Sequence, residues 1–210
     1  MEKQQIIRSV ADYYTEKLAE HGPTPRGVDW NSADSQELRF RQLLQVISDA
    51  TSTTSILDYG CGFGAMFSFI EQHLSKNIRF FGYDISKNMI QQAEKLYGDR
   101  TNAIWLSELK NQEKMDYLVS SGIFNVRLQH QNTDWKAYIL DVLHQFDQLS
   151  TKGFAFNMLT AYSDKPYMKD YLYYADPMFF FDYCKQNFSP YVALLHDYPL
   201  YEFTILVRKQ

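Results

Sequence analysis

Two groups of residues in the sequence could together hold a ligand that contains a nucleoside. The first is the segment ILDYGCGFG at residues 56–64, in which an apolar stretch leads into alternating glycines. Glycine allows a tight turn and lets a ligand come close to the backbone. The second is Asp84, which ends the next apolar stretch. A carboxylate at the end of the second strand of such a unit can accept hydrogen bonds from both ribose hydroxyls.

The residues around the glycines distinguish between possible ligands. With Ala65 as its third small position, the turn fits the looser fingerprint of dinucleotide-binding proteins. Asp58, however, stands just before the glycines, where its carboxylate would oppose a pyrophosphate and attract an ammonium group. S-adenosylmethionine has an amino acid end for Asp58 and a ribose end for Asp84. We therefore favour this ligand and keep NAD(P) as the alternative.

The pattern Asp58-x-Gly60-x-Gly62-x-Gly64 resembles motif I of the class I S-adenosylmethionine-dependent methyltransferases. Asp84 resembles the ribose-binding acid of that family, and the likeness covers about residues 56–208. The resemblance implies that Asp58 and the glycine turn hold the methionine end of the cofactor and that Asp84 holds the ribose. The adenine edge would meet Ser107 or Glu108, and residues 120–125 would line the site of methyl transfer. The expected cofactor-binding residues are Asp58, Gly60, Cys61, Gly62, Gly64, Asp84, Ile85, Glu108, Ser120 and Gly122.

The elements that must position these residues alternate between strand and helix. Apolar segments at 55–60, 78–84, 102–106, 115–122 and 153–159 read as strands. Helices are expected at 64–75, after Ser86 as N-cap up to Gly98, from Thr133 or Asp134, and after Asp176. Residues 191–199 and 200–209 read as two final strands too close together for a crossover helix. We predict an α/β fold: a doubly wound, mostly parallel, seven-stranded sheet with a C-terminal antiparallel hairpin and helices on both faces.

The domain organisation follows from the same reading. Residues 1–54 form an N-terminal helical extension, or cap, of two helices joined by a Pro- and Gly-containing loop at 21–31. Residues 55–210 form the cofactor-binding methyltransferase domain. The loop could close over the site, with Arg26 or Arg39 pairing with the ligand's carboxylate. Alternatively, the loop is a helix connection packed by Trp30.

An aromatic-rich insertion is expected at about residues 162–188, which contain ten Tyr and Phe residues. A single buried helix face cannot accommodate so many rings. Three interpretations stay open, namely a substrate pocket, a dimer contact and plain core. The spacing of three between Tyr171 and Tyr174 predicts that both lie on one helical face.

Composition limits the remaining possibilities. The 210 residues have a net charge of -4, which argues against a nucleic-acid partner because phosphate binding needs a basic face. The N-terminus has no apolar signal-peptide core, and no apolar run approaches the roughly 20 residues of a membrane span. We expect a cytoplasmic protein, a monomer or homodimer, that does not bind membranes. No HExxH motif, His cluster or Cys pair indicates a metal site, so none is expected.

The predicted function is therefore transfer of a methyl group from S-adenosylmethionine to an oxygen or nitrogen of a small-molecule acceptor. The alternatives are an NAD(P)-dependent oxidoreductase that uses the same turn, and a non-catalytic module that binds a nucleoside ligand. The segment SSGIFN at residues 120–125 lacks the Pro-Pro-aromatic pattern of enzymes that methylate planar amino nitrogens. The catalytic residue stays open, and the candidates for a general base are His196, His21 and His130.

Overall fold

The computed structural model describes residues 2–30, 32–48, 53–74, 77–109 and 114–209. The helices are α1 (Glu2–His21), the short 3-10 helix η1 (Pro25–Val28), α2 (Ala33–Leu44), α3 (Ala65–His73), α4 (Lys87–Tyr97), α5 (Asn132–Leu149), the 3-10 helix η2 (Lys165–Tyr167) and α6 (Pro177–Asn187). The strands are β1 (Thr54–Tyr59), β2 (Ile78–Tyr83), β3 (Ala103–Leu106), β4 (Met115–Ser120), β5 (Ser150–Leu159), β6 (Tyr191–Leu195) and β7 (Glu202–Arg208).

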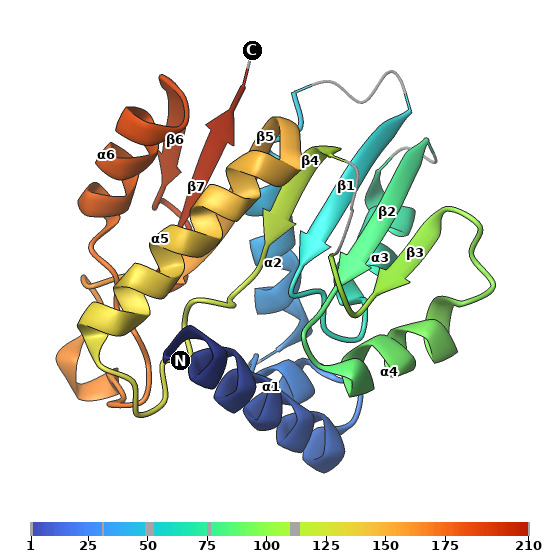
Figure 1. The fold of residues 1–210 in the computed structure, drawn as a ribbon, viewed down its shortest axis with the longest axis horizontal. Coiled ribbons are helices and arrows are strands. Elements are labelled where there is room, and N and C mark those ends of the chain that lie inside the picture. The colour runs from blue at the N-terminus through green and yellow to red at the C-terminus, as the bar shows by residue number, and fades with distance from the viewer. Residues whose placement is uncertain (1, 31, 49–52, 75–76, 110–113, 210) are drawn as a thin grey trace.

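The seven strands form one sheet in the order β3-β2-β1-β4-β5-β7-β6 (Figure 1). Strands β1 to β5 are mutually parallel, whereas β7 runs antiparallel to both β5 and β6. The predicted parallel sheet with a C-terminal antiparallel hairpin is thus confirmed. Because the chain order reverses at β1 and β4, the carboxyl ends of these two strands are where an open α/β sheet binds ligands.

The sheet separates two hydrophobic cores, and neighbouring residues of a strand belong to different cores. Leu57 belongs to the core that contains residues of α1, α5 and α6, whereas its neighbour Ile56 belongs to the core that contains residues of α2 and α3. This division follows from the period-two alternation of side chains along a strand. Figure 1 shows α5 in front of the sheet and α2 and α3 behind it. Both faces of the sheet are therefore covered, as the sequence predicts.

The N-terminal helix crosses the sheet at its functional edge. In Figure 1, α1 runs across the end of the sheet toward which the arrowheads of β1 and β4 point. Ile6 and Val10 of α1 are buried in the hydrophobic core that α5 forms with the sheet. This placement brings Val10 and Tyr14 of α1, and Val28 and Trp30 after it, to the cavity beside the glycine turn. In the described part of the chain, no helix is long and apolar enough to cross a membrane.

The N-cap residues predicted from the sequence mark the observed starts of α4 and α6. Ser86 Oγ accepts a hydrogen bond from the N–H of Met89 at the start of α4, and Asp176 Oδ1 accepts one from the N–H of Met178 at the start of α6. Helix α5 begins slightly earlier than expected, at Asn132. Both caps act through the mechanism that the sequence predicts, a side-chain oxygen that satisfies a free N–H group.

The expectation that Tyr171 and Tyr174 share a helical face is wrong. The segment between η2 and α6 is not helical: it makes a turn at residues 170–171, and its backbone bonds to another part of the chain. The N–H groups of Arg127 and Leu128 both donate to the carbonyl oxygen of Tyr171, at 3.0 and 2.9 Å. The N–H of Tyr173 donates to the carbonyl oxygen of Asn125 at 2.8 Å. Since these backbone groups are engaged across the chain, they are not available for helical bonds.

Candidate active site

The three glycines after β1 all adopt positive φ angles, but they serve different purposes. A Cβ atom at Gly64 would lie 2.5 Å from Cη2 of Trp105, so this glycine is required by packing under the turn. At Gly62, φ is +55°, and the nearest atom to a Cβ would be Cγ1 of Val28 at 3.1 Å. Gly62 faces a cavity, whereas Gly64 is absent from that cavity's described lining. The turn therefore combines one glycine that leaves room for a ligand with one that leaves room for a tryptophan.

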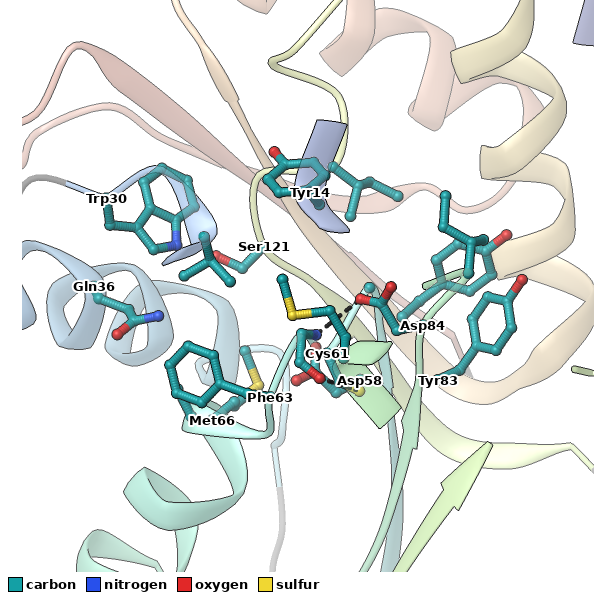
Figure 2. Close-up of a pocket in the computed structure, with 18 of the residues that line it drawn as sticks. Tyr14, Trp30, Gln36, Asp58, Cys61, Phe63, Met66, Tyr83, Asp84 and Ser121 are labelled. Atoms are coloured by element: carbon teal, nitrogen blue, oxygen red, sulfur yellow. Dashed lines mark hydrogen bonds between the residues drawn. The ribbon is translucent and has the colours of Figure 1, made fainter. Parts of the chain in front are cut away.

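Asp84 closes the turn from the end of β2. Its Oδ2 accepts a hydrogen bond from the N–H of Gly62 at 2.9 Å (Figure 2). Its Oδ1 accepts one from the N–H of Ser86 at 2.8 Å. Burial raises the pKa of Asp84 to about 6, against the opposing effect of these two N–H groups. Each carboxylate oxygen keeps a second lone pair, so the group can still accept hydrogen bonds from a ligand.

Asp58, at the end of β1, has no such support. Its side chain is only 2% exposed, and its Oδ1 has no hydrogen-bond partner in the described part of the chain. Burial, with the nearby charge of Asp84, raises the pKa of Asp58 to about 8. A buried polar atom without a partner costs free energy, which a complementary ligand group would recover. A cationic N–H donor is such a group.

A cavity at this turn brings together most of the predicted cofactor residues. Its lining includes Asp58, Gly60, Cys61, Gly62, Asp84 and Ile85. The lining also includes Tyr14 and Trp30, which the sequence associates with the segment that could close the site, and Ser121 of the predicted methyl-transfer segment (Figure 2). The sequence does not indicate four further residues of the lining: Gln36, Tyr83, Met89 and Tyr138. The buried Oγ of Ser121 also lacks a hydrogen-bond partner among the described residues. Two of the side chains around this cavity therefore carry unsatisfied polar atoms.

Four predicted residues lie outside this lining. Ser120 donates its hydroxyl hydrogen to the carbonyl oxygen of Tyr59 at 2.7 Å and so joins β4 to β1. Glu108 is exposed, and Gly64 packs against Trp105. Gly122 lines a second cavity instead, and its N–H donates to Asn157. In the segment after β4, Ser121 thus reaches the first cavity while its two neighbours do not.

The second cavity, of about 390 Å³, adjoins the first. Tyr14, Val28 and Trp30 line both. Tyr167, Tyr171 and Tyr174 of the aromatic insertion form part of its wall, so some residues of the insertion do line a pocket, although Tyr167 lies in η2, Tyr171 in a turn and Tyr174 in irregular structure rather than on one α-helix. Others, such as Phe180, are buried in the core. A volume of this size is within the usual range for small-molecule sites.

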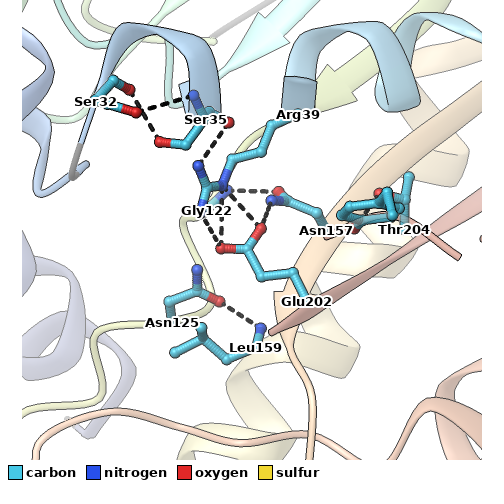
Figure 3. A network of polar contacts seen from close by, with 10 residues as sticks. Ser32, Ser35, Arg39, Gly122, Asn125, Asn157, Leu159, Glu202 and Thr204 are labelled. Carbon is cyan, nitrogen blue, oxygen red and sulfur yellow. Dashed lines mark hydrogen bonds and ion pairs between the residues drawn. The ribbon is translucent and has the colours of Figure 1, made fainter. Parts of the chain in front are cut away.

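A buried ion pair lies at the second cavity. The Nε of Arg39 donates to both carboxylate oxygens of Glu202, at 3.0 and 2.9 Å, and its Nη2 donates to Oε1 at 2.7 Å (Figure 3). The Nδ2 of Asn157 donates to Oε2 of the same glutamate at 2.6 Å. The Arg39 guanidinium carbon also lies 3.9 Å from the ring centre of Trp30. Arg39 is therefore already paired within the protein. Arg26, the other arginine predicted to pair with the ligand's carboxylate, is exposed and is absent from the described lining of both cavities.

The three candidate histidines also lie away from both cavities. His130 Nε2 is 2.8 Å from the hydroxyl of Ser9, and His21 Nε2 is 3.5 Å from a carboxylate oxygen of Glu20. His196 is exposed and packs beside the ring of Tyr162. Within the described ranges, no group of three or more His, Cys, Asp and Glu residues could hold a metal ion.

Comparisons with known proteins agree with this geometry. A family model described as "Methyltransferase domain" matches residues 57–153. The Mycobacterium tuberculosis (strain ATCC 25618 / H37Rv) protein named "Putative methyltransferase Rv1506c" is 46% identical over 163 residues, which cover 78% of this chain and 98% of that protein.

Solved structures share the fold at low sequence identity. A DhpI-SAM-HEP complex is 13% identical, with a TM-score of 0.66 over 97% of this chain and 98% of that one. The N-methyltransferase NodS from Bradyrhizobium japonicum WM9, in complex with S-adenosyl-L-homocysteine, is 13% identical, with a TM-score of 0.61 over 95% and 97%. Since the mycobacterial relative shares 46% of its aligned residues and the sheet has the same fold as both complexes, the chain belongs to the class I S-adenosylmethionine-dependent methyltransferases.

Proposed function

We propose that this enzyme transfers the methyl group of S-adenosylmethionine to an oxygen or nitrogen atom of a small molecule bound in the second cavity. The observation that carries the proposal is that Tyr14, Val28 and Trp30 line both cavities. A cofactor at the glycine turn and an acceptor in the second cavity would then meet at these residues. Family membership favours methyl transfer over both alternatives, the oxidoreductase and the non-catalytic module.

The residues of the first cavity fit the parts of the cofactor. The unpartnered Oδ1 of Asp58 would accept a hydrogen bond from the ammonium of the methionine end. Gly60 and Gly62 would let that end approach the backbone, and Asp84 would accept hydrogen bonds from the ribose hydroxyls. The hydroxyl of Ser121 offers a further polar contact.

The apolar part of the same lining would hold the base of the cofactor. Ile85, Tyr83 and Met89 offer flat or flexible apolar surface next to Asp84. Cys61 belongs to the same lining, and burial raises the pKa of its thiol, which keeps it protonated and unreactive. Glu108 stays a proposed contact to the adenine edge, from an exposed position beyond β3.

The reaction depends mainly on alignment. When bound, the cofactor would supply a methyl group on a positively charged sulfur. The acceptor's lone pair would form a bond to the methyl carbon as the carbon–sulfur bond breaks, and the neutral thioether S-adenosylhomocysteine would leave. Holding two partners in line can supply effective molarities of roughly 10⁵–10⁸ M. Tyr14 lines both cavities, and burial raises the pKa of its phenol, so the hydroxyl stays protonated and can orient the acceptor by hydrogen bonding. A general base is needed only if the acceptor must lose a proton early.

Replacement of Asp84 tests the cofactor site. Asp84→Ala removes two charge-assisted hydrogen bonds to the ribose, so we expect S-adenosylhomocysteine to bind more weakly by about 1.5–3 kcal/mol. Isothermal titration calorimetry measures this change. Asp99→Ala, at an exposed carboxylate near the end of α4, is the matched control and should bind normally. An unchanged dissociation constant for Asp84→Ala would remove Asp84 from the site.

Replacement of two insertion tyrosines tests the acceptor site. Extract fractions are first screened for a compound that receives a labelled methyl group. With that acceptor, the double variant Tyr171→Ala, Tyr174→Ala should raise KM while the affinity for S-adenosylhomocysteine stays nearly constant. A large fall in melting temperature would assign the pair to the core. A change from dimer to monomer with normal kinetics would assign it to a dimer contact.

A further inference from the structure

We propose that the acceptor is a planar aromatic acid whose carboxylate is held by Asn125 and Lys169. This inference rests on the proposed function, because it takes the second cavity as the acceptor site. It goes beyond that function by naming the class of small molecule and the groups that recognise it.

The first argument is the charge balance of the second cavity. Its described lining has four charged side chains, and three of them are already paired. Arg39 and Glu202 bind each other. Asp29 accepts a hydrogen bond from the hydroxyl of Tyr13 at 2.7 Å and lies 3.3 Å from the Nζ of Lys17.

Lys169 is the remaining charge. Its Nζ has no carboxylate partner among the residues that the structure describes, and it lies 5.8 Å from the ring centre of Tyr171. The cavity therefore has one uncompensated positive charge, at an exposed position of its wall. An acceptor with one negative charge would neutralise it.

The second argument is the orientation of the Asn125 amide. This side chain is only 5% exposed and lines the cavity. Its Oδ1 accepts a hydrogen bond from the N–H of Leu159 at 3.0 Å. Because a backbone N–H can only donate, the oxygen must face Leu159, and the amide cannot be flipped. Figure 3 shows the nitrogen turned away from Leu159.

The Nδ2 of Asn125 is thus a fixed donor, and it has no acceptor among the described residues. The side chain is nearly buried and lines the cavity, so an anionic oxygen of a ligand could accept a hydrogen bond from this donor. Asn125 and Lys169 together provide one neutral and one charged donor, both suited to a carboxylate. Neither group suits a cationic acceptor.

The third argument is the shape of the wall. The lining includes the aromatic residues Trp30, Tyr14, Tyr171 and Tyr174, together with the apolar residues Val126 and Leu172. Aromatic rings bind flat partners by offset stacking or edge contacts, which contribute about 0.5–1.5 kcal/mol beyond their buried area. A ring that carries a carboxylate satisfies the walls and the two donors at once.

The experiment uses the full chain with saturating S-adenosylhomocysteine. The probes are benzoate, 4-hydroxybenzoate and indole-3-carboxylate, each beside its neutral carboxamide, titrated by calorimetry up to millimolar concentration. Titration with S-adenosylhomocysteine alone comes first. If that product does not bind, the proposed function fails. If it binds and no acid does, only the present inference is overturned.

The variants locate the carboxylate. Lys169→Met keeps the apolar stem and removes the charge, so acid binding should weaken about threefold and lose part of its salt dependence. Lys165→Met, in η2 and outside the described lining, is the matched control and should bind like the parent. Asn125→Asp keeps an oxygen for the N–H of Leu159 but replaces the donor with an acceptor, so acid binding should weaken at least tenfold.

The expected pattern is that at least one acid binds more tightly than its carboxamide, and that both variants reduce this preference. Equal affinity for acid and carboxamide, or unchanged acid binding in Lys169→Met and Asn125→Asp, would overturn the inference. Thermal denaturation of each variant shows whether a loss of binding reflects a loss of folding. Since Lys169 is exposed, Lys169→Met should fold normally even if Asn125→Asp does not.

Discussion

Asp58 couples the binding site to pH through a single buried oxygen. In the free protein its pKa is raised to about 8, mainly by burial and secondly by Asp84. A ligand ammonium next to Oδ1 would favour the charged form and lower that pKa. Between about pH 6, where Asp84 titrates, and pH 8, the free protein therefore holds a proton on Asp58 that the complex would release.

We predict that S-adenosylhomocysteine binds with release of about one proton at pH 7, and that its affinity rises up to about tenfold per pH unit between pH 6 and 8. Calorimetry in buffers of different ionisation enthalpy measures the proton release. In Asp58→Asn the release should disappear, together with the rise in affinity. Equal heats in all buffers for the parent protein would contradict this assignment of Asp58.

Single substitutions in the glycine turn should affect ligand binding and folding stability to different degrees, depending on the position. Gly62→Ala places a methyl group in the cofactor cavity, where its nearest neighbour is a valine methyl group, so we expect loss of S-adenosylhomocysteine binding with moderate loss of stability. Gly64→Ala places it 2.5 Å from Trp105, so overpacking adds about 1–3 kcal/mol of destabilisation to the strain at positive φ. Thermal denaturation and product titration of both variants distinguish the two roles. Equal melting temperatures would argue against a packing role for Gly64.

At the scale of elements, one ion pair joins the N-terminal region to the end of the sheet. Arg39 on α2 and Glu202 at the start of β7 are both almost fully buried and bind each other through three hydrogen bonds. Removal of one partner from a buried pair leaves the other charge uncompensated, which typically costs about 3–5 kcal/mol. Helix α2 thus depends on β7 for more than apolar packing.

We predict that Arg39→Met and Glu202→Gln each lower the free energy of unfolding by about 3–5 kcal/mol, and that the double variant loses much less than the sum. Denaturant unfolding of the four proteins gives this cycle. The exposed pair of Arg41 and Glu37 on the same helix is the control and should contribute about 0.3–0.5 kcal/mol. Additive losses for the buried pair would show that the two side chains act independently.

Most elements could be predicted because their signals are local. Ser86 and Asp176 cap helices through atoms two or three residues away, and the strands alternate with helices along the chain. The segment before α6 could not be predicted in this way. Its residues, Tyr171 among them, have side chains that suit a helix, but their backbone bonds to residues 125–128, which are distant in sequence. Tertiary pairing overrides local preference there.

At the scale of the whole molecule, the site is only partly visible in the sequence. Asp58, Gly62 and Asp84 could be found because one turn and one strand end bring them together. Tyr14 and Trp30 could only be associated with a segment that could close the site, while Gln36 and Tyr138 could not be found, because they reach the cavity from α2 and α5 through tertiary packing. The three candidate histidines are predicted from their residue type, and residue type does not determine how far a side chain lies from the cavity.

Several predictions at this scale stay predictions. They are the cytoplasmic location, the lack of a nucleic-acid partner, and the monomeric or homodimeric state. The division into residues 1–54 and 55–210 also stays a proposal. The contact between Arg39 and Glu202 crosses that boundary, so the two parts share buried structure.

The position of Trp30 gives the protein a built-in optical signal. The sequence contains three tryptophans, and Trp30 is the one that lines both cavities. Trp135 is fully buried and donates its ring N–H to the carbonyl oxygen of Phe124, while Trp105 lies under the glycine turn. Ligands that enter either cavity should therefore change the emission of Trp30 by displacing water from its ring. Intrinsic fluorescence titration with S-adenosylhomocysteine should show this change, and Trp30→Phe should abolish it, whereas Trp135 and Trp105 would still emit. A full response from the Trp30→Phe variant would instead trace the signal to Trp105 beneath the turn.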